Sequence, residues 1–244
     1  MQRRLTPELM DDPRVPRDEL GRSLAYIRWV NRRLGGASAL LAHLARWSRR
    51  WPRGRPISLL DIATGSADIP VFVRRWGLAR GHDIRVTGVD LHETTLDFAR
   101  EHVRRESRTD PRLAEGITLE RADALKLADH YPPASFDYTH AGLFLHHLPD
   151  VPALTALSIM DKLARAGIVW NDLHRSPLHR KLVEFILVGT TAIVKHDARV
   201  SVEAGFTRAE VLNMARRIGA TYATYHRPPL WYRFTLAGEK PGVW

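Results

Sequence analysis

The 244-residue sequence contains no cysteine, which excludes disulfides, thiolate metal ligands and cysteine nucleophiles. It has no apolar segment near its start, and its longest apolar run, residues 182–194, is only 13 residues long and contains Glu184. Neither a signal peptide nor a membrane-spanning helix is predicted. Because the lack of cysteine also suits a reducing compartment, we expect a cytoplasmic protein.

Lysine is scarce, since 32 of the 37 basic residues are arginine, and the formal net charge at pH 7 is +10. The arginines are spread along the chain, and the one dense patch, residues 46–56, alternates arginine with tryptophan. Such a patch can bind nucleic acid, but a solvated helix end with tryptophans turned inward fits the pattern better. Nucleic acid is therefore not the expected partner.

From residue 57 onward, short apolar runs alternate with segments of helical period, which predicts a parallel sheet wound on both faces. A hairpin of residues 221–225 and 231–236 is expected to close the sheet and to add one antiparallel strand. The expected fold class is α/β, a doubly wound, Rossmann-like sheet of seven strands. The other strands are expected at 57–60, 84–89, 117–119, 136–140 and 167–170, and the helices at 69–80, 94–105, 153–164 and 207–218.

Two further segments are helical and apolar. The spacing of apolar residues predicts one helix over 17–34 and a second from Ser38 to Trp47, and residues 171–206 form a helical insertion. We expect residues 1–54 and 171–206 to form a lid over the domain of residues 55–244. The apolar residues Phe185, Ile186, Leu187 and Val188 suit an apolar acceptor site, the core or a dimer interface equally, so a homodimer stays open.

Acidic residues end three successive predicted strands. Asp61 and Gly65 follow the first strand in the stretch DIATGSADIP, Asp90 ends the second and Asp123 ends the third. Ligands of doubly wound sheets bind outside these carboxyl ends. The turn lacks the G-x-G-x-x-G pattern, and Asp68 at the helix start would repel a pyrophosphate. The pattern favours a ligand with a ribose, an adenine and a positive centre over a dinucleotide.

The motifs DIATGSAD, VTGVD, RADAL and FDYTHAGLFLHHLPD resemble those of class I S-adenosylmethionine-dependent methyltransferases over residues 55–236. The turn with alanine at 63 and 67 is similar to that of the ubiquinone/menaquinone C-methyltransferase branch. The segments ELMDDP, YIRWVNRRLGG and NDLHRSPL also resemble small bacterial natural-product methyltransferases. The resemblance implies S-adenosylmethionine as the cofactor and S-adenosylhomocysteine as its product.

Carried onto this chain, the resemblance implies a role for each strand end. Asp61 and Gly65, in the turn that also holds Ala63, border the methionine portion, and Asp68 faces its ammonium group. Asp90 holds the ribose hydroxyls, and Leu91 lies against the adenine. The adenine amino group donates to Asp123, a ring nitrogen meets the backbone amide of Ala124, and His140 and Ala141 lie beside the sulfonium.

A phenol or enol acceptor also needs a base with a pKa near the working pH, and histidine is the natural candidate. Of the 12 histidines, His146 and His147 follow the fourth strand, and His174 follows the fifth with Asp172 nearby. His140 and His196 rank after these. No metal-ligand spacing such as H-E-x-x-H is present, so no metal is expected.

The expected function is methyl transfer from S-adenosylmethionine to a small, largely apolar aromatic or polyketide-like acceptor, with O-methylation ahead of C-methylation. An RNA ribose methyltransferase and a non-catalytic S-adenosylmethionine-binding protein remain alternatives. RNA base methylation is disfavoured, because the fourth strand is not followed by an Asn/Asp-Pro-Pro-Tyr turn. A dehydrogenase is disfavoured by the missing glycine pattern.

Overall fold

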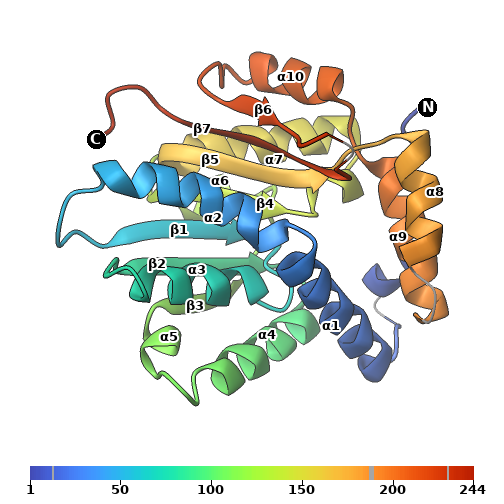
Figure 1. Ribbon diagram of the computed structural model, residues 1–244, viewed down its shortest axis with the longest axis horizontal. Helices are drawn as coiled ribbons and strands as arrows, with labels where there is room; N and C mark the ends of the chain where they lie inside the picture. Colours follow the sequence, from blue (N-terminus) through green and yellow to red (C-terminus); the bar gives the residue numbers. More distant parts are fainter. Residues whose placement is uncertain (13, 187–189, 230) are drawn as a thin grey trace.

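The computed structural model of the chain describes residues 1–12, 14–186, 190–229 and 231–244, with the backbone alone for 182–186. A seven-stranded sheet of order β3-β2-β1-β4-β5-β7-β6 crosses the molecule (Figure 1). β1 to β5 are parallel, and β7 pairs antiparallel with β5 and β6, so the predicted fold class is confirmed. The strands are β1 (Ile57–Ile62), β2 (Ile84–Asp90), β3 (Ile117–Arg121), β4 (Phe136–Gly142), β5 (Ala164–Leu173), β6 (Thr224–His226) and β7 (Arg233–Glu239).

Helices cover both faces of this sheet (Figure 1). The α-helices are α1 (Arg17–Arg33), α2 (Gly36–Trp47), α3 (Asp68–Leu78), α4 (Glu93–Glu106), α5 (Arg112–Glu115), α6 (Leu127–His130), α7 (Asp150–Leu163), α8 (Pro177–Ile186), α9 (Ala192–Ala204) and α10 (Arg208–Arg217). Three short 3-10 helices are η1 (Leu9–Asp11), η2 (Ser48–Arg50) and η3 (Leu145–His147).

Alternation along the strands divides the core into two layers. Leu59 packs with residues of α2 and α3 on one face, whereas Leu60 packs with residues of α7 and α10 on the other. On the first face, Trp47 stacks on Tyr138 with ring centroids 5.1 Å apart, and Trp51 donates to the Tyr138 hydroxyl at 2.7 Å. The tryptophans of the arginine-rich segment 46–56 therefore point inward, as predicted.

The second helix begins two residues before the predicted start. Gly35 forms the N-cap of this helix. Its φ of +92° is a left-handed backbone conformation that a residue with a side chain would adopt only with strain. The helix that follows residue 206 has the predicted capping box. Thr207 Oγ1 accepts from the Glu210 amide, and Glu210 accepts from the Thr207 amide at 2.7 Å.

The fifth strand extends beyond its predicted end. The sequence pattern ends this strand at residue 170, but β5 continues to Leu173. Asn171 pairs with both β4 and β7, and Asp172 and Leu173 pair with β7. Asn171 and Asp172 are consequently 1% and 0% exposed inside the sheet, so the prediction that the insertion starts at residue 171 is wrong. The insertion starts later, with α8 and α9. Leu187 and Val188 lie outside the described residues, as do the side chains of Phe185 and Ile186.

The N-terminal segment and the insertion meet beyond the carboxyl ends of the strands, where α1 and α9 lie in Figure 1. Helix α9 contacts α1, η1 and η3. The amides of Leu9 and Met10 donate to the Asp197 carboxylate of α9 at 2.7 and 3.1 Å, which fixes η1 against this helix. None of the described helices is both long and apolar enough to cross a membrane.

Candidate active site

A cavity of about 1260 Å³ lies between the carboxyl ends of β1 to β4 and the segments η1, α1 and α9. Ala141 is not on its wall, because alternation along β4 turns this side chain into the core. The other residues assigned to the cofactor by resemblance line the cavity; they are Asp61, Ala63, Gly65, Asp68, Asp90, Leu91, Asp123, Ala124 and His140.

The turn after β1 has an unusual backbone. Ala63, Gly65 and Ala67 have φ values of +55°, +55° and +57°, although only one of the three is glycine. The alanines are held there by hydrogen bonds around them, from the Thr64 amide to Val89 O at 2.9 Å and from the Ala67 amide to Thr64 O at 3.0 Å. Strained backbone of this kind persists where the surroundings fix it, often at ligand sites.

Asp90 connects this turn to β2. Its Oδ2 accepts from the Gly65 amide at 3.0 Å and its Oδ1 from the His92 amide at 3.1 Å. Burial raises the pKa of Asp90 above its usual range, and the two amide hydrogen bonds oppose that shift. Asp123 is fixed in a similar way, since its Oδ1 accepts from the Leu125 amide at 2.9 Å. Both carboxylates are therefore held in place on the cavity wall.

Asp61 and His140 form a buried pair. Asp61 Oδ1 lies 2.6 Å from His140 Nδ1, and Asp61 Oδ2 accepts from the Thr64 hydroxyl at 2.6 Å. His140 Nε2 has no hydrogen-bond partner among the described residues. Gly142 leaves room for the ring, because a Cβ there would lie 2.9 Å from His140 Cε1. A ligand in the cavity can supply the missing partner.

Asp68 is joined to helix α1 by Asn31, a residue that was not among the predicted site residues. Asn31 of α1 donates to Asp68 Oδ2 at 3.0 Å and accepts from Arg233 at 2.9 Å, and Arg233 also donates to Asn171 at 2.7 Å. Asn31 lies between Ile27 and Leu34 on the mainly apolar face of α1, and a polar residue at this position is the signal that the sequence offers. The chain of contacts fixes α1 over the turn that follows β1.

His146 lies in a second polar cluster. Asp172 Oδ1 is 2.6 Å from His146 Nδ1, and Glu8 Oε1 is 3.4 Å from His146 Nε2. Burial alone would lower the pKa of His146, but these two carboxylates raise it. His147 lies beside it, with Nδ1 2.9 Å from Asp11 and Nε2 3.7 Å from Glu8. Glu8 and Asp11 belong to the ELMDDP motif, but no sequence spacing connects them with residues 146 and 147.

His174 is not brought to the cavity wall. Its ring Nδ1 lies 3.3 Å from the Tyr225 hydroxyl, and its backbone amide donates to Tyr232. Burial lowers the pKa of His174 to about 4. Asp172, although it is near His174 in the sequence, pairs with His146. His196 pairs with Asp197 at 3.1 Å and is likewise absent from the wall.

Comparison with known proteins gives one family match and one curated relative. Residues 59–167 match a family model described as a methyltransferase domain. The 27-O-demethylrifamycin SV methyltransferase of Amycolatopsis mediterranei is 33% identical over 92 residues. The alignment covers 38% of this chain and 29% of that relative, so the chain matches less than a third of its length.

Solved structures of methyltransferases share the fold. Magnesium protoporphyrin IX methyltransferase from Synechocystis, solved with S-adenosylhomocysteine, has a TM-score of 0.59 and 14% identity, with 91% of this chain and 97% of that chain covered. An O-methyltransferase family protein from Burkholderia thailandensis has a TM-score of 0.58 and 14% identity, with 92% of this chain and 58% of that chain covered. These likenesses show the fold, residues 59–167 match the methyltransferase domain model, and the predicted resemblance to class I S-adenosylmethionine-dependent methyltransferases is confirmed.

Proposed function

We propose that the protein transfers the methyl group of S-adenosylmethionine to an oxygen of a small, largely apolar acceptor. The observation that carries the proposal is that Asp61, Asp90 and Asp123, from three adjacent strands, line one cavity. In the proposed complex, Asp90 accepts from the ribose hydroxyls and Asp123 from the adenine amino group. S-adenosylmethionine has these groups as well as the positive charge that the acidic wall favours.

The acceptor lies under the lid. Five apolar residues of helix α1 line the cavity, and so do Val194 and Val202 of α9. An apolar wall of this extent suits a flat, apolar acceptor. The α1 residues are Leu20, Leu24, Ile27, Val30 and Leu34.

Oxygen as the methyl acceptor is supported by two observations. The Amycolatopsis mediterranei relative is named for an O-demethylated rifamycin. Glu8, His146 and His147 form a polar part of the wall where an acceptor hydroxyl can be held and lose its proton. The lid also excludes water, and alignment of oxygen, methyl and sulfur supplies much of the acceleration.

Calorimetric titration tests the cofactor, and labelled S-adenosylmethionine tests the transfer. We expect S-adenosylhomocysteine to bind with a dissociation constant well below about 1 mM, a standard free energy of about −4 kcal/mol or better. We expect the label to appear on the oxygen of a phenolic or polyketide acceptor. Binding of NAD but not of S-adenosylhomocysteine would show that the proposed cofactor assignment is wrong. Binding without transfer to any acceptor would favour a non-catalytic binding protein.

Cofactor affinity is expected to depend on pH through Asp68. Burial raises the pKa of Asp68 to about 6, with Asp61 adding to the shift and Asn31 and Arg28 opposing it. As the pH falls from 7 to 5, the carboxylate takes up a proton and loses its charge-assisted contact with the ammonium group of S-adenosylmethionine. The affinity should fall about fivefold, equivalent to about 1 kcal/mol. Calorimetry between pH 7 and pH 5 measures the dissociation constant of S-adenosylmethionine. The affinity of Asp68→Asn should change little over this range. A steep pH dependence in that variant would show that Asp68 is not the group responsible.

A further inference from the structure

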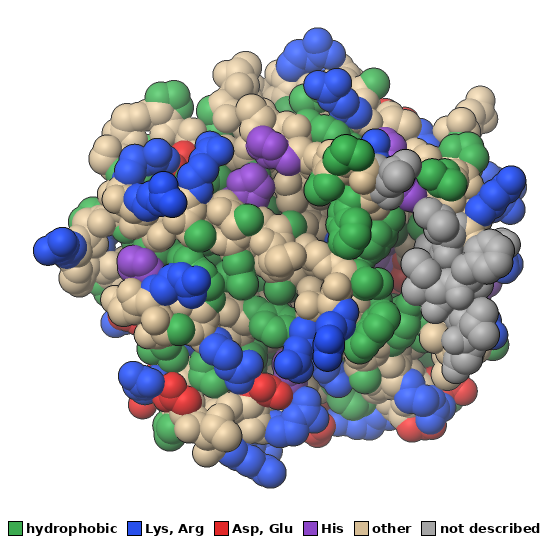
Figure 2. Space-filling model, viewed as in Figure 1, with side chains coloured by type: hydrophobic (Ala, Val, Ile, Leu, Met, Phe, Trp, Pro, Cys, Tyr) green, Lys and Arg blue, Asp and Glu red, His purple; other side chains and the backbone are tan. Residues whose placement is uncertain are grey.

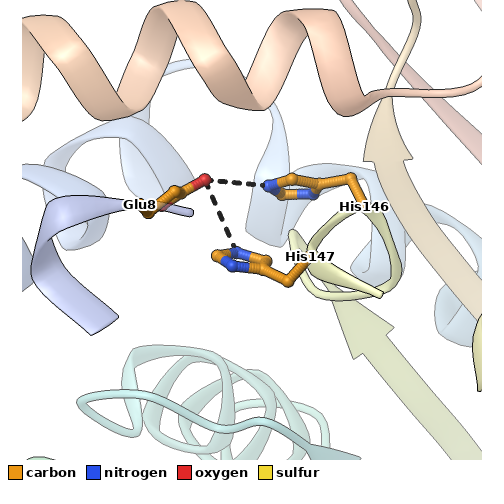
Figure 3. A group of neighbouring side chains, drawn as sticks. All are labelled: Glu8, His146 and His147. Atoms are coloured by element: carbon orange, nitrogen blue, oxygen red, sulfur yellow. Dashed lines mark hydrogen bonds and ion pairs between the residues drawn. The ribbon is translucent and has the colours of Figure 1, made fainter. Parts of the chain in front are cut away.

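We propose that Glu8, His146 and His147 bind a divalent transition-metal ion at the acceptor side of the cavity. Figure 3 shows Glu8 reaching from the N-terminal segment toward the two histidine rings, which follow β4. Glu8 Oε1 lies 3.4 Å from His146 Nε2 and 3.7 Å from His147 Nε2. One potential ligand atom from each residue lies within 4.8 Å of the others.

These spacings fit metal ligands better than they fit direct hydrogen bonds. Bonds of about 2.0–2.2 Å at a tetrahedral zinc ion place the ligand atoms about 3.3–3.6 Å apart. The two distances from Glu8 Oε1 lie at or just beyond that range. A charge-assisted hydrogen bond between the same atoms would be about 2.7–2.9 Å long. The contacts of Glu8 therefore have nearly the spacing of metal ligands already. Closing on an ion requires the histidine ligand atoms, which lie within 4.8 Å of each other, to reach the same spacing.

Both imidazoles are also oriented as metal ligands are. Asp172 holds His146 through Nδ1 at 2.6 Å, and Asp11 holds His147 through Nδ1 at 2.9 Å. In each ring, Nδ1 therefore pairs with a carboxylate of Asp172 or Asp11, and Nε2 faces Glu8. Histidines that bind metals usually present one nitrogen to the ion and the other to such a carboxylate. Asp172 is itself fixed by donors from Trp170 Nε1 at 3.0 Å and the Leu173 amide at 2.8 Å.

Charge and ligand type favour a transition metal. The carboxylates of Glu8, Asp11 and Asp172 surround the two imidazoles, and a dication would offset most of their negative charge. Two histidines with one carboxylate suit zinc or iron(II), whereas magnesium and calcium prefer oxygen ligands alone. Three protein ligands leave a coordination position open, and all three residues line the cavity.

The role of the ion rests on the proposed function. In that setting the ion binds the acceptor hydroxyl oxygen and lowers its pKa, and the proton leaves to water. The oxygen then forms a bond to the methyl carbon as the carbon–sulfur bond breaks. The electron pair of that bond stays on sulfur, which becomes the neutral thioether of S-adenosylhomocysteine.

The experiment measures zinc binding by the full chain after treatment with a chelator. Calorimetry with zinc chloride should show one ion per chain. Glu8→Gln and His147→Gln should each weaken zinc binding by more than about 100-fold, beyond the range of about 10- to 100-fold expected for Asp172→Asn, which only orients His146. His174→Gln is the matched control, because His174 lies near the same edge but off the cavity wall, and its zinc affinity should be unchanged.

Each variant is first compared with the unaltered chain in thermal midpoint and in S-adenosylhomocysteine affinity, so that loss of zinc binding is not loss of folding. The proposal would be overturned if the unaltered chain bound no zinc, or if Glu8→Gln and His147→Gln bound zinc as tightly as the unaltered chain. The cluster would then be an ion pair that fixes the N-terminal segment. Zinc binding that depends on Glu8 in a chain that binds no S-adenosylhomocysteine would support the metal site and refute the proposed function.

Discussion

Replacing Asp172 by alanine is expected to lower the free energy of unfolding by about 3–5 kcal/mol, the usual cost of removing one partner of a buried ion pair. Asp172 is fully buried in β5, and three groups depend on it, namely His146 Nδ1, Trp170 Nε1 and the Leu173 amide. The alanine variant leaves all three without this acceptor in a place that water does not reach. Urea denaturation monitored by circular dichroism measures the change.

Two variants calibrate this result. Asp172→Asn keeps the shape of the side chain and an acceptor oxygen, so it should cost less than Asp172→Ala. Asp129→Ala removes an exposed carboxylate from α6 and should change the free energy of unfolding by no more than about 0.5 kcal/mol. A loss below about 1 kcal/mol in Asp172→Ala would mean that the pair with His146 contributes little to the fold.

Replacing Asp90 by alanine should weaken the binding of S-adenosylhomocysteine by about 2 kcal/mol, or about 30-fold, because two charge-assisted hydrogen bonds to the ribose are lost together. The side chain is placed for this at the end of β2, where the amides of Gly65 and His92 hold its two oxygens. Calorimetric titration gives the two dissociation constants.

The same carboxylate also supports the turn that follows β1, so Asp90→Asn is needed beside the alanine variant. It keeps the shape and one acceptor oxygen, and it should bind more weakly than the unaltered chain but more tightly than Asp90→Ala. Asp129→Ala again serves as the control with unchanged affinity. If Asp90→Ala folds and binds S-adenosylhomocysteine as tightly as the unaltered chain, Asp90 does not hold the ribose.

The fold was predictable because its signals are local. Apolar runs of strand length alternate with helical periods. Asp61, Asp90 and Asp123 lie at or just after the ends of consecutive strands, so topology alone brings them to one edge. The end of β5 was not predictable in this way. Asn171 and Asp172 are polar in sequence, but pairing with β4 and β7 and the partners Arg233 and His146 allow them to be buried.

The second cluster was beyond sequence reasoning for a different reason. Glu8 is 138 positions from His146, and its approach depends on how η1 packs on α9. Histidine at 174 has a more suggestive local context, with Asp172 two residues before it. His174 lies beyond the end of β5, however, and its ring contacts the Tyr225 hydroxyl, whereas Asp172 pairs with His146 of η3.

The most direct measurement is a crystal structure of the chain with S-adenosylhomocysteine bound. We expect the ligand to lie in the cavity at the carboxyl ends of β1 to β3. Both ribose hydroxyls should lie within hydrogen-bond distance of Asp90, and the adenine amino group should lie beside Asp123. Electron density for the nucleoside anywhere else, or a cavity that stays empty at saturating ligand, would contradict it.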